Sequence, residues 1–281
     1  MKYQDIINKI FNCNTKLIKL DKGLTNDIYL TTINNINYAI RIPKDDINNI
    51  ININNENKVL ELIRNTNLDV KEYYYNTNNR IRITYYINDT IEYKDNNDPN
   101  KIIKVAKLLK QLHNINTNNL DVYFNPIDMY YKYKSNIHNY LYNINNYEYI
   151  IDKIKEYDIN YVLCHNDLVS GNILFTKDKE YLIDYEYAGL NDPIFDIMSF
   201  LTENNINDTN ERNKFYNEYF DNINDKLIDK MNIYESFTNL LWYCWANMMY
   251  DTRKELIYKE IAIDKYNALK NSCLIHNILI K

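Results

Sequence analysis

Long hydrophobic runs are missing from this sequence, and so is the apolar core of an export signal. The most hydrophobic window, Leu240 to Tyr250, is far shorter than the roughly 20 apolar residues that a helix needs to cross a bilayer. At the start of the chain, Met1 to Asn14 mixes charged residues with isolated isoleucines, unlike a signal peptide. We therefore expect no membrane insertion and a cytoplasmic location.

The sequence also lacks a block of basic residues and any C-x-x-C pair. Its 33 lysine and arginine residues are outnumbered by 38 acidic residues, and the net charge is −5. Proteins that bind nucleic acid phosphates carry a basic patch, so we expect no nucleic-acid partner. The dispersed cysteines favour free thiols in a reducing compartment over disulfides or a metal site; they are Cys13, Cys164, Cys244 and Cys273.

The chain does have enough apolar residues for a sizeable core, 46% of 281, which allows one large domain or two lobes. Within residues 1–87, short β-type runs separated by turn residues predict an antiparallel five-stranded sheet, and a helical stretch around Glu56 lies between the third and fourth strands. The predicted strands are Lys16–Leu20, Ile28–Ile33, Ile36–Ile42, Val70–Tyr75 and Arg80–Ile87.

Residues 88–281 have a different, mainly helical pattern. Asp98-Pro99 is typical of a helix start, and apolar residues at helical spacing follow up to His113. Only short apolar runs interrupt the helices, at Tyr161–Cys164, Ile173–Phe175 and Tyr181–Ile183. The sequence therefore predicts an α+β protein with a smaller N-terminal lobe and a larger helical C-terminal lobe.

The short runs flank a set of polar residues suited to phosphoryl transfer. This reaction needs a carboxylate that orients the acceptor hydroxyl, oxygen ligands for Mg²⁺, and cations on the phosphates. In His165-Asn166-Asp167 the aspartate precedes Asn172 by five residues, and Asp184 follows a predicted β-hairpin. A lone H-x-D tripeptide occurs by chance, and a lone aspartate is usually solvated or caps a helix. The ordered combination instead favours Asp167 as the base and Asn172 and Asp184 as metal ligands.

This ordered pattern resembles the kinase-like phosphotransferases of the aminoglycoside phosphotransferase and choline/ethanolamine kinase superfamily, from about Gly23 to Trp245. The resemblance implies a bilobal protein-kinase-like fold with ATP and Mg²⁺ as cofactors, bound together with the acceptor between the lobes. In this family a turn between the first two strands faces the phosphates, which corresponds here to Gly23, Thr25 and Asn26. A plain hairpin turn is the alternative for these three residues.

Strand periodicity places Ala39 and Arg41 on one face, and the resemblance puts the small side chain under the adenine and the guanidinium near the phosphates. Arg41 followed by Ile42-Pro43 looks like choline kinases. Glu56 is the expected ion-pair partner of Arg41, and Glu61 on the same predicted helix is a rival. His165 and Asp196 are expected to support the catalytic loop without taking part in the chemistry.

Three places in the sequence point to the acceptor. Asn166 and Glu186 are typical of choline and ethanolamine kinases, and Glu186 would either attract a cationic substrate or help to hold a second metal ion. Trp242 and Trp245 are spaced to share one helix face, where they would form walls of an aromatic cage for a quaternary ammonium. Core packing is the competing explanation for the tryptophans. Tyr187 is a further candidate wall.

Choline kinase is therefore the leading expectation, with choline as the small-molecule substrate and ethanolamine as the nearest alternative. An aminoglycoside or other small-metabolite kinase comes next. A catalytically dead kinase-like scaffold is disfavoured because Arg41, Asp167, Asn172 and Asp184 are all present. The sequence leaves the oligomeric state and the downstream pathway open, because either phospholipid precursor synthesis or surface decoration would consume phosphocholine.

Overall fold

The structure, a computed structural model, describes residues 2–20, 26–44 and 53–278. Contacts group the chain into two compact units. Unit 1 consists of Met1–Asn97 and Gly171–Tyr187, and unit 2 of Asp98–Ser170 and Ala188–Lys281. The units are therefore described one at a time.

Unit 1 contains a five-stranded antiparallel sheet in the order β1-β2-β3-β5-β4. This confirms the sheet expected from the alternating pattern, with boundaries that shift by a few residues. Between β2 and β3 the turn residues Asn34 and Asn35 both have positive φ angles, 50° and 64°, which is the geometry of a tight hairpin turn that asparagine tolerates. The strands are β1 (Ile18–Leu20), β2 (Asn26–Ile33), β3 (Ile36–Pro43), β4 (Glu72–Tyr75) and β5 (Arg82–Tyr85).

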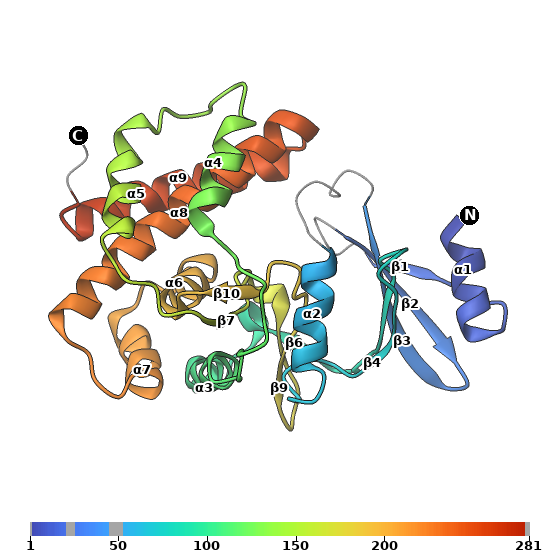
Figure 1. Ribbon diagram of the computed structural model, residues 1–281. Coiled ribbons are helices and arrows are strands. Elements are labelled where there is room, and N and C mark those ends of the chain that lie inside the picture. Colours follow the sequence, from blue (N-terminus) through green and yellow to red (C-terminus); the bar gives the residue numbers. More distant parts are fainter. Residues whose placement is uncertain (1, 21–25, 45–52, 279–281) are drawn as a thin grey trace. The chain divides into compact units, whose positions relative to one another are not determined.

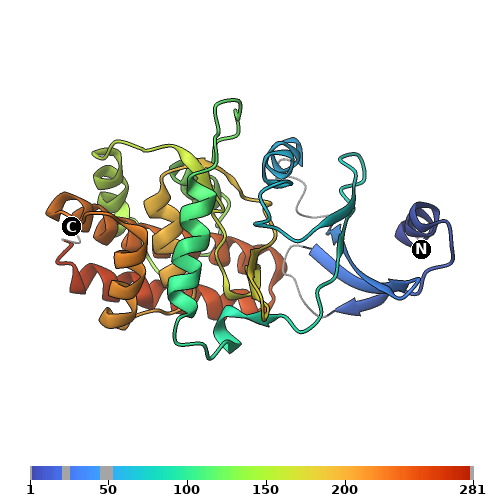
Figure 2. The ribbon, with the colours of Figure 1, turned by 90° about the horizontal axis from the view of Figure 1, so that it is seen from below.

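Two helices cover opposite faces of this sheet, as Figures 1 and 2 show. One is α2 (Ile53–Ile63), which the sequence predicted, and the other is α1 (Lys2–Phe11), which it did not. Ile7 of α1 is fully buried against alternate residues of β3, including Ile40. The intervening residues of β3, among them Arg41, therefore point toward α2.

A second, smaller sheet completes unit 1. Its order is β6-β8-β9, with β6 (Ile91–Glu92), β8 (Ile173–Phe175) and β9 (Glu180–Leu182). Because β6 pairs with β8, the hairpin that carries Asn172 and Asp184 is grouped with the N-terminal residues and not with the chain around it. The division of the chain into lobes 1–87 and 88–281 stays a prediction.

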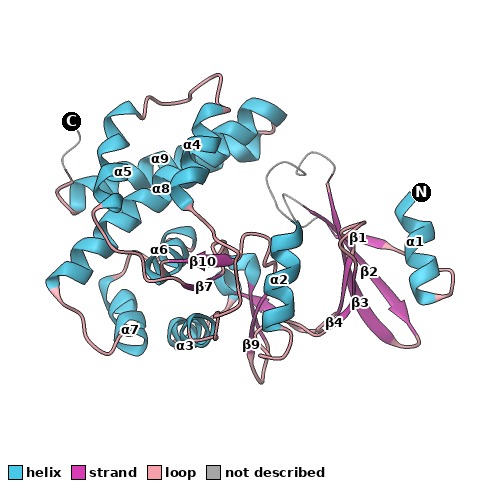
Figure 3. Cartoon of the chain, in the orientation of Figure 1, coloured by secondary structure: helices cyan, strands magenta, loops and turns pink. Residues whose placement is uncertain are grey.

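Unit 2 is mostly helical (Figure 3). Its first long helix begins at Lys101, and Asn100, not Asp98, occupies the N-cap position. The two-stranded sheet of β7 (Val162–Cys164) and β10 (Gly189–Asn191) ends directly before His165-Asn166-Asp167. The helices are α3 (Lys101–His113), α4 (Pro126–Ser135), α5 (Glu148–Lys155), α6 (Pro193–Glu203), α7 (Thr209–Tyr219), α8 (Asp225–Arg253) and α9 (Leu256–Ile275).

The interior of unit 2 is built around α6 and α8. Phe195 and Phe200 of α6 and Phe237 of α8 have no exposed surface. Burial of each such side chain contributes roughly 1.5–3 kcal/mol relative to exposure. Among the described residues, no helix is both long and apolar enough to span a membrane.

Candidate active site

The β8–β9 hairpin brings Asn172 and Asp184 to the same end of unit 1. Ile173 pairs with Leu182, and the N–H of Ile183 donates to the carbonyl of Asn172 at 3.0 Å. The two predicted metal ligands therefore leave the hairpin side by side. Asn172 is 8% exposed, and its amide is held at the edge of the core.

Asp184 adopts a left-handed backbone conformation with φ of 67°. Residues other than glycine rarely adopt it, and it costs roughly 1–2 kcal/mol, although a short polar side chain reduces the cost. Such conformations persist where surrounding contacts enforce them and are concentrated at functional sites. Asp184 also forms an ion pair with Arg41, in which Nη1 lies 2.5 Å from Oδ1.

Arg41 is the centre of the charged cluster in unit 1. Its Nη2 donates to Oε1 of Glu56, so the ion pair predicted from the sequence is present. Glu56 is 2% exposed. Burial alone would lower the pKa of Arg41, but the nearby carboxylates of Glu56, Asp184 and Glu186 raise it well above its usual range. Arg41 therefore keeps its positive charge beside these three acidic side chains.

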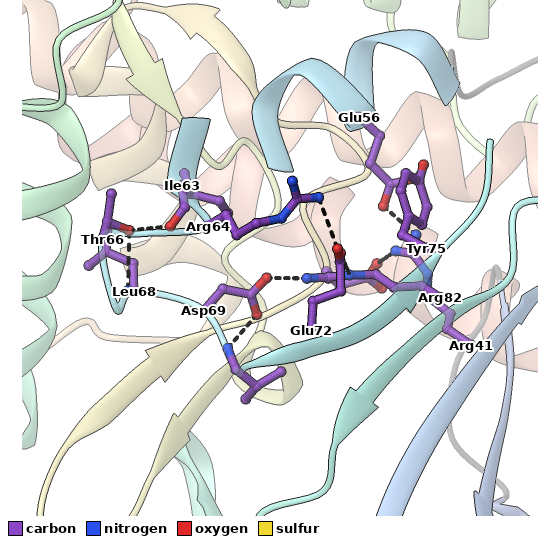
Figure 4. Close-up of polar contacts among 12 residues, drawn as sticks. Arg41, Glu56, Ile63, Arg64, Thr66, Leu68, Asp69, Glu72, Tyr75 and Arg82 are labelled. Carbon is purple, nitrogen blue, oxygen red and sulfur yellow. Dashed lines mark hydrogen bonds and ion pairs between the residues drawn. The ribbon is translucent and has the colours of Figure 1, made fainter. Parts of the chain in front are cut away.

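A second layer of contacts surrounds this cluster (Figure 4). The Tyr75 hydroxyl donates to Oε2 of Glu56 at 3.3 Å. Arg82, the cross-strand neighbour of Arg41, forms ion pairs with Asp69 and Glu72. Two adjacent arginines on one sheet face would repel each other, and separate carboxylates offset that repulsion. The sequence motifs gave no indication of Tyr75 or Arg82.

Glu186 makes a buried contact with the start of β2. Nδ2 of Asn26 donates to Oε2 of Glu186 at 2.8 Å, and the two residues are 4% and 8% exposed. Tyr187, next along the chain, is 9% exposed. Gly23 and Thr25 lie outside the described residues, so the phosphate-facing turn stays a prediction. Ala39 lies on the same face of β3 as Arg41, as the strand periodicity predicted.

In unit 2, the loop that follows β7 is fixed from beneath by Asp196 of α6. Its carboxylate accepts the backbone N–H groups of His165 at 2.6 Å and Asn166 at 2.7 Å. His165 is fully buried. These contacts are those expected of a structural support for the loop, and they hold the backbone directly before the partly exposed Asp167.

The same support extends to a helix that the sequence did not associate with the site. Nε2 of His113 lies 3.1 Å from Oδ2 of Asp196, and Nδ1 of His113 lies 2.6 Å from the Tyr219 hydroxyl. Ligand atoms of His113, Cys164 and Asp196 lie within 4.8 Å of one another. Burial raises the pKa of the Cys164 thiol well above its usual range, and a protonated thiol is a poor metal ligand. The cluster is a hydrogen-bonded brace.

Asn166 also has a left-handed backbone, with φ of 65°. Its side chain is fully buried, and Nδ2 of Asn191 donates to Oδ1 of Asn166 at 2.8 Å. Asparagine fits this position because it tolerates a positive φ and its side chain forms local hydrogen bonds. These two features give a structural reason for an asparagine directly before Asp167.

The two tryptophans lie together on α8 as their spacing predicted. Their ring centroids are 6.2 Å apart at 86°, and Trp245 makes a similar edge contact with Tyr258 of α9 at 5.7 Å. Trp242 is 7% exposed and Tyr258 fully buried, whereas Trp245 is partly exposed. The pair is thus partly core and partly accessible, and Tyr258 is an aromatic neighbour that the sequence analysis did not identify.

Solved structures with the same architecture are kinase-like phosphotransferases. The structure of choline kinase LicA from Streptococcus pneumoniae matches with a TM-score of 0.81 at 23% identity, over 97% of this chain and 99% of that one. The ADP-bound aminoglycoside phosphotransferase APH(2'')-Ib matches with a TM-score of 0.63 at 20% identity, over 95% and 98%. The predicted protein-kinase-like α+β fold is confirmed.

The sequence comparisons narrow this class. The family model for choline/ethanolamine kinase matches residues 17–270, and the chain therefore belongs to the choline/ethanolamine kinase family, whose members are phosphotransferases that act on an alcohol. Protein LicA of Haemophilus influenzae is 25% identical over 250 residues, which cover 80% of this chain and 71% of that protein. A LicA homolog of Mycoplasma capricolum is 30% identical over 163 residues, 54% of this chain and 65% of that protein.

Proposed function

We propose that this protein is a choline kinase that transfers the γ-phosphoryl group of ATP to the hydroxyl of choline. The ion pairs that join Arg41 to Asp184 and Glu56 are the main structural support, because they link a phosphate-binding cation to a metal-binding carboxylate. Similar proteins support ATP and choline as the substrates. One LicA structure contains AMP, and another is described as a choline kinase.

The donor set in unit 1 fits Mg²⁺. An amide oxygen of Asn172 and a carboxylate of Asp184 are the hard oxygen ligands that Mg²⁺ prefers. The carboxylates of Glu56, Asp184 and Glu186 all interact with the Arg41 guanidinium, so negative charge is concentrated beside these two ligands. Bound there with the nucleotide, Mg²⁺ would neutralise negative charge on the phosphates. We assign Asn172 and Asp184 as its protein ligands.

In the proposed reaction, Asp167 of unit 2 accepts a hydrogen bond from the choline hydroxyl and orients its oxygen toward the γ-phosphorus. A bond forms between the hydroxyl oxygen and the γ-phosphorus, the bond from that phosphorus to the β,γ-bridging oxygen breaks, and the hydroxyl proton passes to Asp167. The products are phosphocholine and ADP. Arg41 donates to the phosphate oxygens, where its charge is needed as ADP leaves.

Trp242, Trp245 and Tyr187 are the proposed contacts for the trimethylammonium group, and Glu186 is a proposed anionic contact. An ammonium over an aromatic ring is stabilised by about 0.5–2 kcal/mol. The edge-to-face arrangement of Trp245 with both Trp242 and Tyr258 supports an aromatic wall at this place. Of these three rings, Trp242 and Tyr258 are buried and Trp245 is partly exposed, so Trp245 is the ring that a ligand would contact.

Ethanolamine is the second candidate acceptor. Ethanolamine kinase 2 of Rattus norvegicus is 43% identical to this chain over 54 residues, although these are only 18% of the chain. A primary ammonium gains more from carboxylates and hydrogen bonds than from aromatic faces. Glu186 would therefore matter more for ethanolamine, and the tryptophans more for choline.

A cytoplasmic location is part of the proposal. All four cysteines are free, and three of them are buried, as expected in a reducing compartment. ATP is also available there. We propose a small molecule as the only substrate partner and assign no nucleic-acid partner.

ADP release in a coupled assay tests the proposal. The purified protein with ATP and Mg²⁺ is offered choline, ethanolamine or an aminoglycoside in separate reactions. We expect the highest kcat/KM with choline. Asp167→Asn should reduce turnover by at least about a hundredfold, because general base assistance typically contributes that much, while ADP binding stays unchanged. Absence of turnover with every aminoalcohol would contradict the kinase proposal.

A further inference from the structure

A series of hydrogen bonds in unit 2 runs from Tyr219 of α7 through His113 and Asp196 to the backbone directly before Asp167. The Tyr219 hydroxyl lies 2.6 Å from Nδ1 of His113, and Nε2 of the same ring lies 3.1 Å from Oδ2 of Asp196. We propose that Tyr219 is a positioning residue, which acts through His113 to hold Asp167 in place for the acceptor hydroxyl. The inference rests on the proposed function, in which Asp167 orients that hydroxyl.

The first argument concerns the direction of each hydrogen bond. Asp196 is fully buried and accepts the backbone N–H groups of His165 and Asn166, which favours its ionised form. Nε2 of His113 therefore carries a proton and donates to Oδ2 of this carboxylate. A neutral imidazole has a single N–H group, so Nδ1 is an acceptor. The Tyr219 hydroxyl donates to it, and partial burial, which raises the pKa of Tyr219 above its usual value, keeps that hydroxyl protonated.

The second argument is that the imidazole ring needs both of its hydrogen bonds to stay in one orientation. His113 is buried, and among the described residues its two nitrogens contact Asp196 and Tyr219. Without the Tyr219 hydroxyl, Nδ1 would be a buried acceptor that lacks a donor, which is unfavourable. The ring would then turn toward another donor, and Nε2 would move away from Asp196. The hydroxyl therefore fixes the ring that supports the carboxylate.

The third argument is the connection from the Asp196 carboxylate to the loop after β7. Oδ2 accepts from both His113 and the N–H of His165, and Oδ1 accepts the N–H of Asn166. Donors on both oxygens oppose rotation of the carboxylate. Asn166 also has a left-handed backbone, with φ of 65°, and Asp167 follows it directly. The direction in which Asp167 leaves this segment therefore depends on the orientation of the carboxylate.

Aromatic packing holds the Tyr219 ring itself. The ring stacks on Phe215 with centroids 5.9 Å apart and meets the His113 ring edge-on at 5.6 Å. Phe215 is the buried residue of α7, and it packs against Phe200 of α6, the helix that carries Asp196. A side chain that positions another must have its own orientation fixed by packing, and Tyr219 meets this requirement.

Four variants of the full-length protein separate positioning from a general structural role. Tyr219→Phe removes the hydroxyl and keeps the ring. His113→Gln replaces the imidazole by an amide whose Nε2 donates to Asp196 without a choice of tautomer, and a double variant combines the two changes. Tyr216→Phe is the matched control, because it removes from the same helix a hydroxyl that interacts with Arg212.

Two measurements are made on each variant. Hydrogen exchange of the backbone N–H groups of His165 and Asn166 is followed by NMR in the protein without ligands. It is compared with exchange at Phe237 in the middle of α8, because a general loss of stability would speed exchange at all three positions. Steady-state kinetics with ATP, Mg²⁺ and choline gives kcat and the KM of each substrate.

We expect Tyr219→Phe to speed exchange at the two loop positions about fivefold more than at Phe237, as for an opening confined to the loop. It should lower kcat about tenfold and leave both KM values within about twofold, since a misplacement of about 1 Å costs roughly a hundredfold in rate. In the His113→Gln background, loss of the Tyr219 hydroxyl should change kcat by less than about twofold, because the two residues act as one unit. Tyr216→Phe should behave like the wild type.

Other results would overturn the inference. Equal acceleration of exchange in the loop and in α8 would reduce the Tyr219 hydroxyl to a general structural role, as would a loss of kcat no greater than that of Tyr216→Phe. Additive losses of kcat in the double variant would show that Tyr219 does not act through His113. Because hydrogen exchange needs neither ATP nor an acceptor, unchanged exchange in Tyr219→Phe is distinct from a failure of the wild-type protein to phosphorylate choline.

Discussion

Arg41 and Asp184 are joined by a 2.5 Å contact between Nη1 and Oδ1, although 143 residues separate them in the sequence. The same guanidinium also contacts Glu56 from α2. A single side chain thus ties β3, α2 and the segment after β9 together. The proposed phosphate cation and the proposed metal ligand therefore belong to one network of ion pairs.

This network predicts that Arg41→Ala lowers kcat/KM for ATP by roughly a hundredfold or more, the usual effect of removing a group that stabilises charge in the transition state. Arg41→Lys should fall in between, because an ammonium keeps the charge but lacks the planar fork that reaches two carboxylates. Steady-state kinetics with varied ATP measures both. Arg64→Ala is the control, since Arg64 is 47% exposed and pairs only with Glu72 among the contacts seen. Equal losses in the Arg41→Ala and Arg64→Ala variants would contradict the assignment.

Glu56 and Glu61 offer a matched pair on one helix. Glu56 is 2% exposed and paired with Arg41, whereas Glu61 is exposed and accepts a hydrogen bond from Asn57. Removing one partner of a buried ion pair costs about 3–5 kcal/mol. Glu56→Gln should therefore lower the free energy of unfolding by an amount of that order, and Glu61→Gln by less than about 0.5 kcal/mol. Urea denaturation of both variants measures the difference, and similar losses would show that the buried pair does not stabilise unit 1.

The strands of the first sheet could be predicted because alternation of buried and exposed residues repeats within each strand. The same alternation correctly placed Ala39 and Arg41 on one face. In contrast, α1 was missed, although Ile6, Ile7 and Ile10 recur at helical spacing. The lysines and asparagines between them conceal the pattern, and the helix gains its stability from burial of Ile7 on the sheet, which is a tertiary contact.

The candidate catalytic residues could be proposed from the sequence because Asp167, Asn172 and Asp184 lie within a short stretch of chain, and their catalytic roles stay predictions. Their supports could not. His113 reaches Asp196 from 83 residues away, and nothing in the local sequence around His113 indicates that contact. Helix spacing predicted the pairing of Trp242 with Trp245 but not the contribution of Tyr258, which comes from another helix.

The left-handed backbone of Asn166 leads to a prediction about stability. Asn166→Ala forces an alanine to a φ of 65° and also removes the buried hydrogen bond from Asn191. Asn166→Gly removes only the side-chain contacts. The alanine variant should therefore be less stable than the glycine variant by about 1 kcal/mol, the approximate cost of a left-handed conformation for a residue with a Cβ atom. Chemical denaturation measures the free energy of unfolding of both variants. A glycine variant less stable than the alanine variant would contradict the prediction and would show that intrinsic backbone propensity dominates. Asn34→Ala and Asn34→Gly are the control pair. Asn34 is exposed and has a φ of 50°, so the difference between these two variants measures the cost of the left-handed backbone without a buried side chain.

The lowered pKa of Glu235 leads to a prediction about how the stability of unit 2 changes with pH. Burial raises its pKa, but hydrogen bonds from Arg212 and His276 outweigh burial and lower the pKa to about 2. A carboxyl with a lowered pKa in the folded state stabilises the protein above its unfolded pKa, and this contribution is lost as the pH falls toward the folded pKa. The loss should amount to about 3 kcal/mol between pH 5 and pH 2, from 1.36 kcal/mol for each pKa unit. Urea unfolding at several pH values should show a shallower decline in Glu235→Gln than in the wild type. Parallel curves would exclude this contribution.

The aromatic contacts around Trp245 make the sharpest test of the acceptor. Trp245→Leu keeps an apolar side chain but removes the ring, so the KM for choline should rise about two- to thirtyfold, corresponding to the 0.5–2 kcal/mol of one cation–π contact. The KM for ethanolamine should rise less, because a primary ammonium depends more on hydrogen bonds. Trp242 is more deeply buried, and Trp242→Leu should lower stability as well as affinity, because it leaves a cavity. Tyr266→Leu is the control, since Tyr266 stacks on Tyr142 with ring centroids 4.2 Å apart and has no proposed part in binding. Equal KM values for choline in the wild type and Trp245→Leu would assign the tryptophans to core packing, and the preference for choline would then require another explanation.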